Sequence, residues 1–132
     1  MTTKPTSFQT PSRRVRYLGA AHSGTQHAWG MRVSSAALTL LTIAGVWLAL
    51  ALVGKSYAEV REMFAHRVMP GTIVLLFVAT TLYHMRLGMQ TIIEDYVHDE
   101  AAKTWALMAN SFFCALVGVA TAVAVLKLCV GA

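Results

Sequence analysis

Three long apolar runs constrain the fold of this sequence more than any other feature. They occupy residues 33–54, 69–93 and 104–130. Each run is close to or longer than the ~20 residues that a helix needs to cross the hydrocarbon core of a bilayer. The sequence therefore predicts an all-α membrane protein with three transmembrane helices.

Small residues recur within these runs, which allows the backbones of neighbouring helices to approach closely. The runs therefore predict a helix bundle, part of a heteromeric assembly. No internal repeat and no second apolar domain is visible. We divide the chain into a basic amino-terminal tail and span entry, residues 1–31, and a three-helix transmembrane domain, residues 32–132.

The composition supports a membrane location and argues against a soluble domain. Only 13% of the 132 residues are charged, and the mean hydropathy is +0.55; soluble domains carry about 25% charged residues. The formal charge of +5 does not indicate nucleic-acid binding. The basic residues before the first run do not alternate with aromatic side chains that would form a platform for stacking bases. We expect a lipid membrane as partner and no nucleic acid.

The distribution of basic residues predicts the orientation of the chain. The amino-terminal tail and second loop hold six Lys or Arg side chains, while the first loop and the carboxyl end hold four. Because basic residues stay on the cytoplasmic side, the amino terminus and the loop 94–103 are predicted to be cytoplasmic. The tail is also compatible with a mitochondrial transit segment, but we favour the bacterial inner membrane over the mitochondrial inner membrane.

Ionisable residues form a stripe on the second run. His84, Gly88, Thr91 and Asp95 follow the i, i+4, i+7, i+11 spacing of one helix face. An ionisable side chain inside the bilayer costs a few kcal/mol on insertion scales. The stripe is therefore expected to face a partner, a cofactor or a polar path.

His84 is a candidate axial ligand of a haem iron. A neutral imidazole binds iron, and Gly88, one turn further on, removes a side chain where a flat macrocycle would approach. The alternative is that His84 only hydrogen-bonds across helices, and spacing alone does not decide between the two. The other two runs contain no histidine, so a second axial ligand would come from another subunit.

Two further polar residues, Arg86 and Tyr96, accompany the stripe. Arg86 lies about 200° around the helix from His84, so it faces elsewhere; it meets either a haem propionate on the partner side or, as we favour, a carbonyl or a carboxylate. Tyr96 and Asp95 lie where the span ends. A Tyr hydroxyl can donate to a carbonyl oxygen while a carboxylate orients protons. The alternative is an interfacial tyrosine anchor beside a solvated acidic loop.

The second run resembles the small cytochrome b membrane anchor of succinate dehydrogenase, respiratory complex II. The matching pattern is H-x3-G-x6-D-Y, formed here by His84, Gly88, Asp95 and Tyr96. The resemblance implies that His84 is an axial ligand of haem b, that Gly88 allows the haem to approach, and that Tyr96 hydrogen-bonds a ubiquinone carbonyl with Asp95 nearby.

A second motif strengthens this resemblance and places it with alphaproteobacterial members. The segment "SGTQHAWGMR" is similar to their SG-x2-H-x-W-x2-R entry, with Ser23, Gly24, His27, Trp29 and Arg32 at the matching positions. By this resemblance Arg32 lies near a haem propionate or in the quinone pocket. The segments "RVSSAAL" and "GMQ" depart from the usual pattern, close to Arg32 and Gly88.

The resemblance also implies the partners and the function. The "SPHL" entry and "HR-x-TG" motif of the companion cytochrome b anchor are absent, which favours the small hydrophobic anchor over its companion. The chain is expected to join that companion anchor, an iron–sulfur subunit and a flavoprotein, and to help pass electrons from the iron–sulfur subunit to ubiquinone. Succinate oxidation would occur on another chain, so this chain alone is not expected to catalyse a reaction. Alternatives are the anchor of a fumarate reductase, a haem-free three-span assembly or scaffold protein and, ranked last, a transporter component.

Overall fold

The computed structural model describes residues 23–130, which form four helices. Three are long: α2 (Ser23–Leu52), α4 (Val68–Tyr96) and α5 (Glu100–Val130). The short helix α3 (Tyr57–His66) lies between the first two. The described part of the chain contains no strand. All three long helices are long and apolar enough to cross a membrane, which confirms the predicted all-α fold with three spans.

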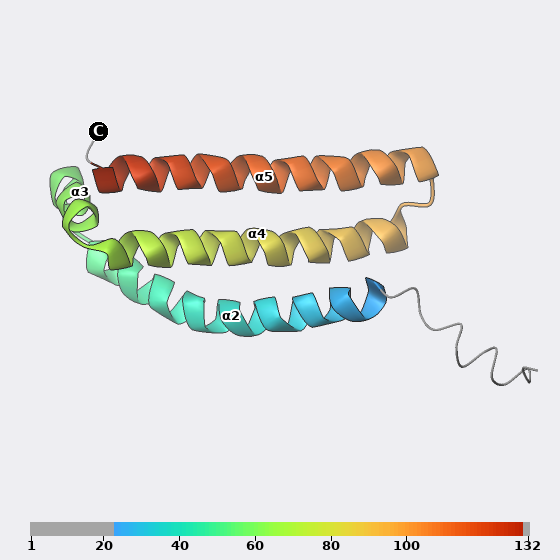
Figure 1. The fold of residues 1–132 in the computed structure, drawn as a ribbon, viewed down its shortest axis with the longest axis horizontal. Helices are drawn as coiled ribbons and strands as arrows, with labels where there is room; N and C mark the ends of the chain where they lie inside the picture. Colours follow the sequence, from blue (N-terminus) through green and yellow to red (C-terminus); the bar gives the residue numbers. More distant parts are fainter. Residues whose placement is uncertain (1–22, 131–132) are drawn as a thin grey trace, which may run out of the picture.

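The long helices form a single layer with α4 in the middle. Figure 1 shows α2 and α5 running alongside α4 on opposite sides of it, and both pack against it. Glycines let side chains of a neighbouring helix pack close to the helix backbone. A Cβ built on Gly71 of α4 would lie 3.0 Å from Cys129 Sγ of α5, and one built on Gly118 of α5 would lie 3.4 Å from Leu82 of α4. The predicted close approach at small residues is therefore present.

The helices extend beyond the predicted spans. The sequence predicts a first span over 33–54, but α2 begins ten residues earlier, at Ser23, so part of the segment assigned to the tail is helical. The reason is that hydropathy counts only the residues needed to cross the hydrocarbon core. At 1.5 Å per residue, the 30 residues of α2 cover about 45 Å, so its polar end continues into the headgroup layer. Residues 1–22 lie outside the described part of the chain.

The connection between the first two spans contains a helix that sequence reasoning treated only as a loop. A capping box begins α3: the Ser56 hydroxyl accepts from Glu59 N, and Ser56 N donates to Glu59 Oε2 at 2.7 Å. This S-x-x-E pattern satisfies two backbone donors at a helix start. Helix α3 packs against α4 and α5, and its residue Phe64 is buried.

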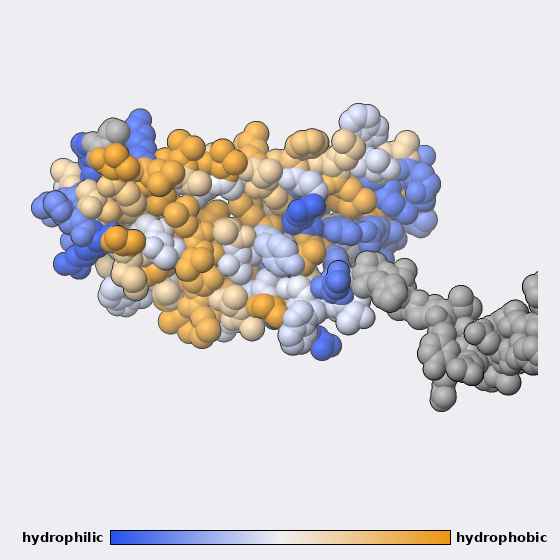
Figure 2. Space-filling view, in the orientation of Figure 1, coloured by the Kyte–Doolittle hydropathy of each residue, from blue (hydrophilic) through white to orange (hydrophobic). Residues whose placement is uncertain are grey.

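Most large apolar side chains point outward from the layer. Figure 2 shows apolar residues over the middle of the molecule and hydrophilic ones towards its ends. Among residues 23–130, the buried apolar side chains are Leu48, Phe64, Ile93, Cys114 and Val125. Many others, such as Trp47 and Phe112, are about two-thirds exposed. The faces of the layer are therefore built to meet lipid or other protein helices rather than water.

Candidate functional site

The His84 ring lies between α4 and α2. Its Nδ1 is 2.8 Å from the hydroxyl oxygen of Ser34, which is only 4% exposed. The Ser34 hydroxyl in turn donates to the backbone carbonyl of Met31, at 3.1 Å. A chain of two hydrogen bonds therefore joins the histidine ring to the backbone of the neighbouring helix.

The Ser34 hydroxyl has one proton to donate and two neighbours, Met31 O at 3.1 Å and His84 Nδ1 at 2.8 Å. When that proton goes to Met31 O, the Ser34 oxygen accepts from a protonated Nδ1, and Nε2 is the ring nitrogen with the lone pair. Within residues 23–130 Nε2 has no hydrogen-bond partner.

These properties of His84 fit an iron ligand. Metal-bound histidines almost always donate their second ring nitrogen to a carboxylate, a carbonyl or another acceptor, which fixes the ring orientation. The Ser34 hydroxyl can take that place here, and Nε2 of the half-buried ring has no partner within residues 23–130. The donor set of this chain therefore suits one axial position of a haem.

The rest of the predicted stripe follows the same interface. Thr91 Oγ1 lies 3.0 Å from His27 Nε2 of α2, and it donates to Leu87 O at 3.2 Å. A Cβ built on Gly88 would lie 3.8 Å from Met31 Cε. His84, Gly88 and Thr91 thus share one helix face, as predicted, and that face is turned towards α2. The space beside Gly88 is bordered by the flexible end of Met31.

Asp95 and Tyr96 lie at the end of α4, at the edge of the layer. Both are exposed, and the Tyr96 side chain is 77% exposed. Within the described residues neither side chain forms a hydrogen bond or an ion pair. Their polar atoms are therefore available to a group outside this chain.

The two arginines point away from His84. Arg32 is two residues from Ser34, about 200° around α2, so its exposed side chain lies on the side of α2 opposite α4. The backbone carbonyl of Arg86 accepts from Asn110 Nδ2 of α5 at 3.1 Å. Within residues 23–130 no hydrogen bond or ion pair reaches either guanidinium. The structure does not bring Arg32 and His84 together.

Sequence reasoning missed Ser34 and gave His27 no role of its own. The sequence signal that could have identified both residues is a spacing that the first two spans share. His27 and Ser34 are seven residues apart on α2, and His84 and Thr91 are seven residues apart on α4. In an antiparallel pair, this spacing places each histidine opposite a hydroxyl, which is the arrangement observed.

Comparisons with known proteins identify the family of the chain. Residues 6–118 match the family described as succinate dehydrogenase/fumarate reductase transmembrane subunit. The chain is 33% identical over 113 residues to the succinate dehydrogenase hydrophobic membrane anchor subunit of Paracoccus denitrificans, covering 86% of this chain and 87% of that protein.

A second relative covers a similar part of the chain. The succinate dehydrogenase hydrophobic membrane anchor subunit of Rickettsia bellii is 29% identical over 120 residues, covering 89% of this chain and 94% of that protein. No solved structure matches. The family match spans all but the last part of α5 and includes His84, Ser34 and their hydrogen-bonded neighbours. This chain therefore belongs to the succinate dehydrogenase/fumarate reductase transmembrane-subunit family.

Proposed function

We propose that this chain is the membrane anchor of a succinate dehydrogenase and contributes one axial ligand to haem b and part of a ubiquinone site. The family match supports the anchor role. The observation that carries the cofactor proposal is the hydrogen-bond chain from His84 through Ser34 to Met31 O. It orients the ring, and in the tautomer protonated at Nδ1 it leaves Nε2 free to bind iron within the membrane-spanning part of α4.

In this proposal His84 Nε2 would hold the iron, and Ser34 would orient the ring by accepting from Nδ1. Gly88 would leave room for the porphyrin, with a shift of the Met31 side chain. The companion cytochrome b anchor would supply another ligand. When bound, the haem would supply one-electron redox capacity.

The quinone site is proposed at the carboxyl end of α4. The exposed Tyr96 hydroxyl donates to a ubiquinone carbonyl oxygen, and Asp95 orients or supplies a proton as the quinone is reduced. Arg32 faces away from α4, so its anionic or carbonyl partner lies towards the companion anchor. We assign it to a haem propionate or to the quinone pocket wall.

The remaining chemistry belongs to other chains. A flavoprotein oxidises succinate, and an iron–sulfur protein delivers the electrons to the quinone end of α4 on the cytoplasmic side of the bacterial inner membrane. The basic amino-terminal tail would lie on that side too. A fumarate reductase would use the same anchor with electrons flowing in reverse, and the family includes both enzymes.

One observation favours a second candidate function, a haem-free assembly or scaffold protein. The His84 to Ser34 hydrogen bond joins two helices, which is what a purely structural histidine does. The two functions differ at Nε2, because a structural histidine leaves that nitrogen without a metal. They therefore differ in whether the assembled complex carries haem and reduces quinone through this chain.

The proposed quinone site is tested by measuring two activities of the full complex separately, one that needs the quinone site and one that does not. We compare wild type with Tyr96→Phe, measuring succinate-dependent reduction of a water-soluble dye and of ubiquinone. If Tyr96 binds quinone, the variant keeps dye reduction and loses about tenfold or more in ubiquinone kcat/KM. Tyr57→Phe, an exposed tyrosine at the other end of the layer, is the matched control. Equal ubiquinone reduction in both variants would remove Tyr96 from the site.

A further inference from the structure

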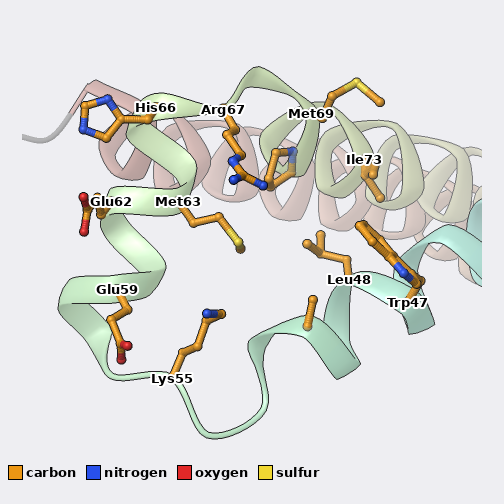
Figure 3. Close-up of a pocket in the computed structure, with 12 residues that line it drawn as sticks. Trp47, Leu48, Lys55, Glu59, Glu62, Met63, His66, Arg67, Met69 and Ile73 are labelled. Atoms are coloured by element: carbon orange, nitrogen blue, oxygen red, sulfur yellow. The ribbon is translucent and has the colours of Figure 1, made fainter.

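A large hollow lies at the opposite end of the layer from Asp95 and Tyr96. It has a volume of about 830 Å³ and lies between the end of α2, helix α3 and the start of α4. Figure 3 shows its residues as sticks. None of them belongs to the His84 interface, so the proposed haem and quinone chemistry leaves this hollow without a role.

Two cations point into the hollow from opposite sides. In Figure 3, Lys55 reaches in from the loop after α2, and Arg67 reaches in from the residue before α4. Among residues 23–130, neither side chain has a hydrogen bond or an ion pair. The Glu59 carboxylate is close enough to Lys55 for its pKa to be lowered by that charge, but its hydrogen bonds go to Ser56.

Apolar side chains form the remainder of the wall. Met63 points in from α3, and Leu48 and Trp47 line the side that continues along the α2 span. Met69 and Ile73 continue the wall along α4. The hollow therefore has a charged mouth and an apolar inner side that runs down the membrane-spanning part of the layer.

The two cations also lie at the depth of lipid headgroups. Lys55 comes three residues after the end of α2, and Arg67 is the residue before the start of α4. Helices as long as α2 and α4 extend past the hydrocarbon core, so their ends lie in the headgroup layer, where the phospholipid phosphates are. A pair of inward-pointing cations without protein partners is expected to meet an anionic oxygen group there.

We propose that this hollow binds one membrane phospholipid with a zwitterionic, phosphatidylethanolamine-type headgroup. Its phosphodiester lies between Lys55 and Arg67, and an acyl chain follows the wall formed by Leu48, Met69 and Ile73. The carboxylates on the rim, Glu59 and Glu62, balance the two cations. That balance favours a neutral headgroup carrying an ammonium over a purely anionic one.

The test measures phospholipid retained by the purified complete complex. Complexes are exchanged into nanodiscs of mixed phosphatidylethanolamine and phosphatidylglycerol, released, and examined by native mass spectrometry. The Lys55→Gln/Arg67→Gln double variant should retain phosphatidylethanolamine about tenfold less than wild type, because it loses both charge-assisted contacts. Lys127→Gln is the matched control, since it removes an exposed basic side chain near the carboxyl end of α5 and should leave retention unchanged.

A second variant works without changing charge. Met63→Trp fills the hollow from α3 and should reduce retention even if the double variant assembles poorly. Unchanged phosphatidylethanolamine retention in either assembled variant would overturn the proposal, as would preferential retention of phosphatidylglycerol. Efficient cross-linking of Met63→Cys to the companion anchor would also overturn it, because a protein segment would then fill the hollow.

Discussion

At the scale of single residues, the proposed function depends mainly on Ser34 and His84. Their hydrogen bond joins the histidine ring to α2, and a ring protonated at Nδ1 can bind a metal through Nε2. His84 was identified from sequence because an ionisable side chain inside a membrane span is energetically costly and therefore usually has a functional role. Ser34 was not identified, because it lies fifty residues away in the chain and resembles the small packing residues beside it.

Removing the Ser34 hydroxyl should weaken haem binding without removing the ligand. In Ser34→Ala, Nδ1–H loses its acceptor and the ring loses its fixed orientation, so haem retention should fall about tenfold. The midpoint potential should rise, because the imidazole becomes a poorer electron donor to iron. The measurement is a redox titration followed at the haem absorption band of the purified complex.

The control for this prediction keeps the hydroxyl in place. Ser34→Thr retains an acceptor for Nδ1–H and should restore the wild-type potential, which a purely space-filling role of Ser34 would not require. A potential in Ser34→Ala equal to that of wild type would show that the residue acts only in helix packing.

At the scale of helices, the sequence predicted the three spans but not their ends or α3. The spans were predictable because a run of about twenty apolar residues has few other stable folds. The first span was predicted to begin where the apolar residues begin, but the polar segment "SGTQHAWGMR" before them is also helical. Helix α3 was missed because its signal is local: Ser56 and Glu59 form a capping box, which hydropathy along the chain does not reveal.

The packing of α4 against α5 should be sensitive to Gly71. A Cβ at this position would meet Cys129 Sγ at 3.0 Å and Val125 Cγ1 at 3.3 Å, so Gly71→Ala should lower the stability of the complex by about 1 kcal/mol. Gly45→Ala is the control, because its Cβ would lie 4.0 Å from its nearest neighbour, Phe77. Thermal unfolding of the purified complex compares the two, and equal melting temperatures would contradict the packing described.

The start of α3 should respond to acid. The hydrogen bonds from Ser56 lower the pKa of Glu59, with a smaller contribution from Lys55. Because the folded pKa lies below the unfolded one, the stabilisation is present at neutral pH and is lost as the pH falls through the lowered pKa, below the ordinary glutamate value of about 4.3. Amide hydrogen exchange in α3 should be faster in Ser56→Ala than in wild type at pH 7. That difference should shrink in acid, because the bonds to the Glu59 carboxylate weaken while the bond from Glu59 N to the Ser56 hydroxyl remains; a difference independent of pH would contradict the contribution of the Glu59 carboxylate.

At the scale of the whole molecule, the layer is incomplete by itself. Its broad apolar faces are exposed (Figure 2), and its candidate site residues Asp95, Tyr96 and Arg32 find no side-chain partner within the described chain. Both properties are expected of one component of a membrane complex. The half of the site that belongs to other chains was not predictable from this sequence, because its contacts come from chains with their own sequences.

The orientation of the layer is a prediction that can be measured directly. The excess of basic residues predicts that the connection between α4 and α5 is cytoplasmic and that α3 lies on the other side. In intact cells, a membrane-impermeant thiol reagent should label Tyr57→Cys and spare His98→Cys, and inverted membrane vesicles should give the opposite pattern. The reverse labelling pattern would show the opposite orientation, with Asp95 and Tyr96 away from the cytoplasmic side.

The central claim, that His84 binds a haem iron, is tested most directly by the dithionite-reduced minus oxidised spectrum of membranes containing the complete complex. The comparison is between wild type, His84→Leu and the control His66→Leu, an exposed histidine on α3. We expect a sharp b-type alpha band in wild type and in His66→Leu, and its loss or displacement in His84→Leu. An unchanged band in an assembled His84→Leu complex would contradict the claim and leave His84 as a helix-bridging residue only.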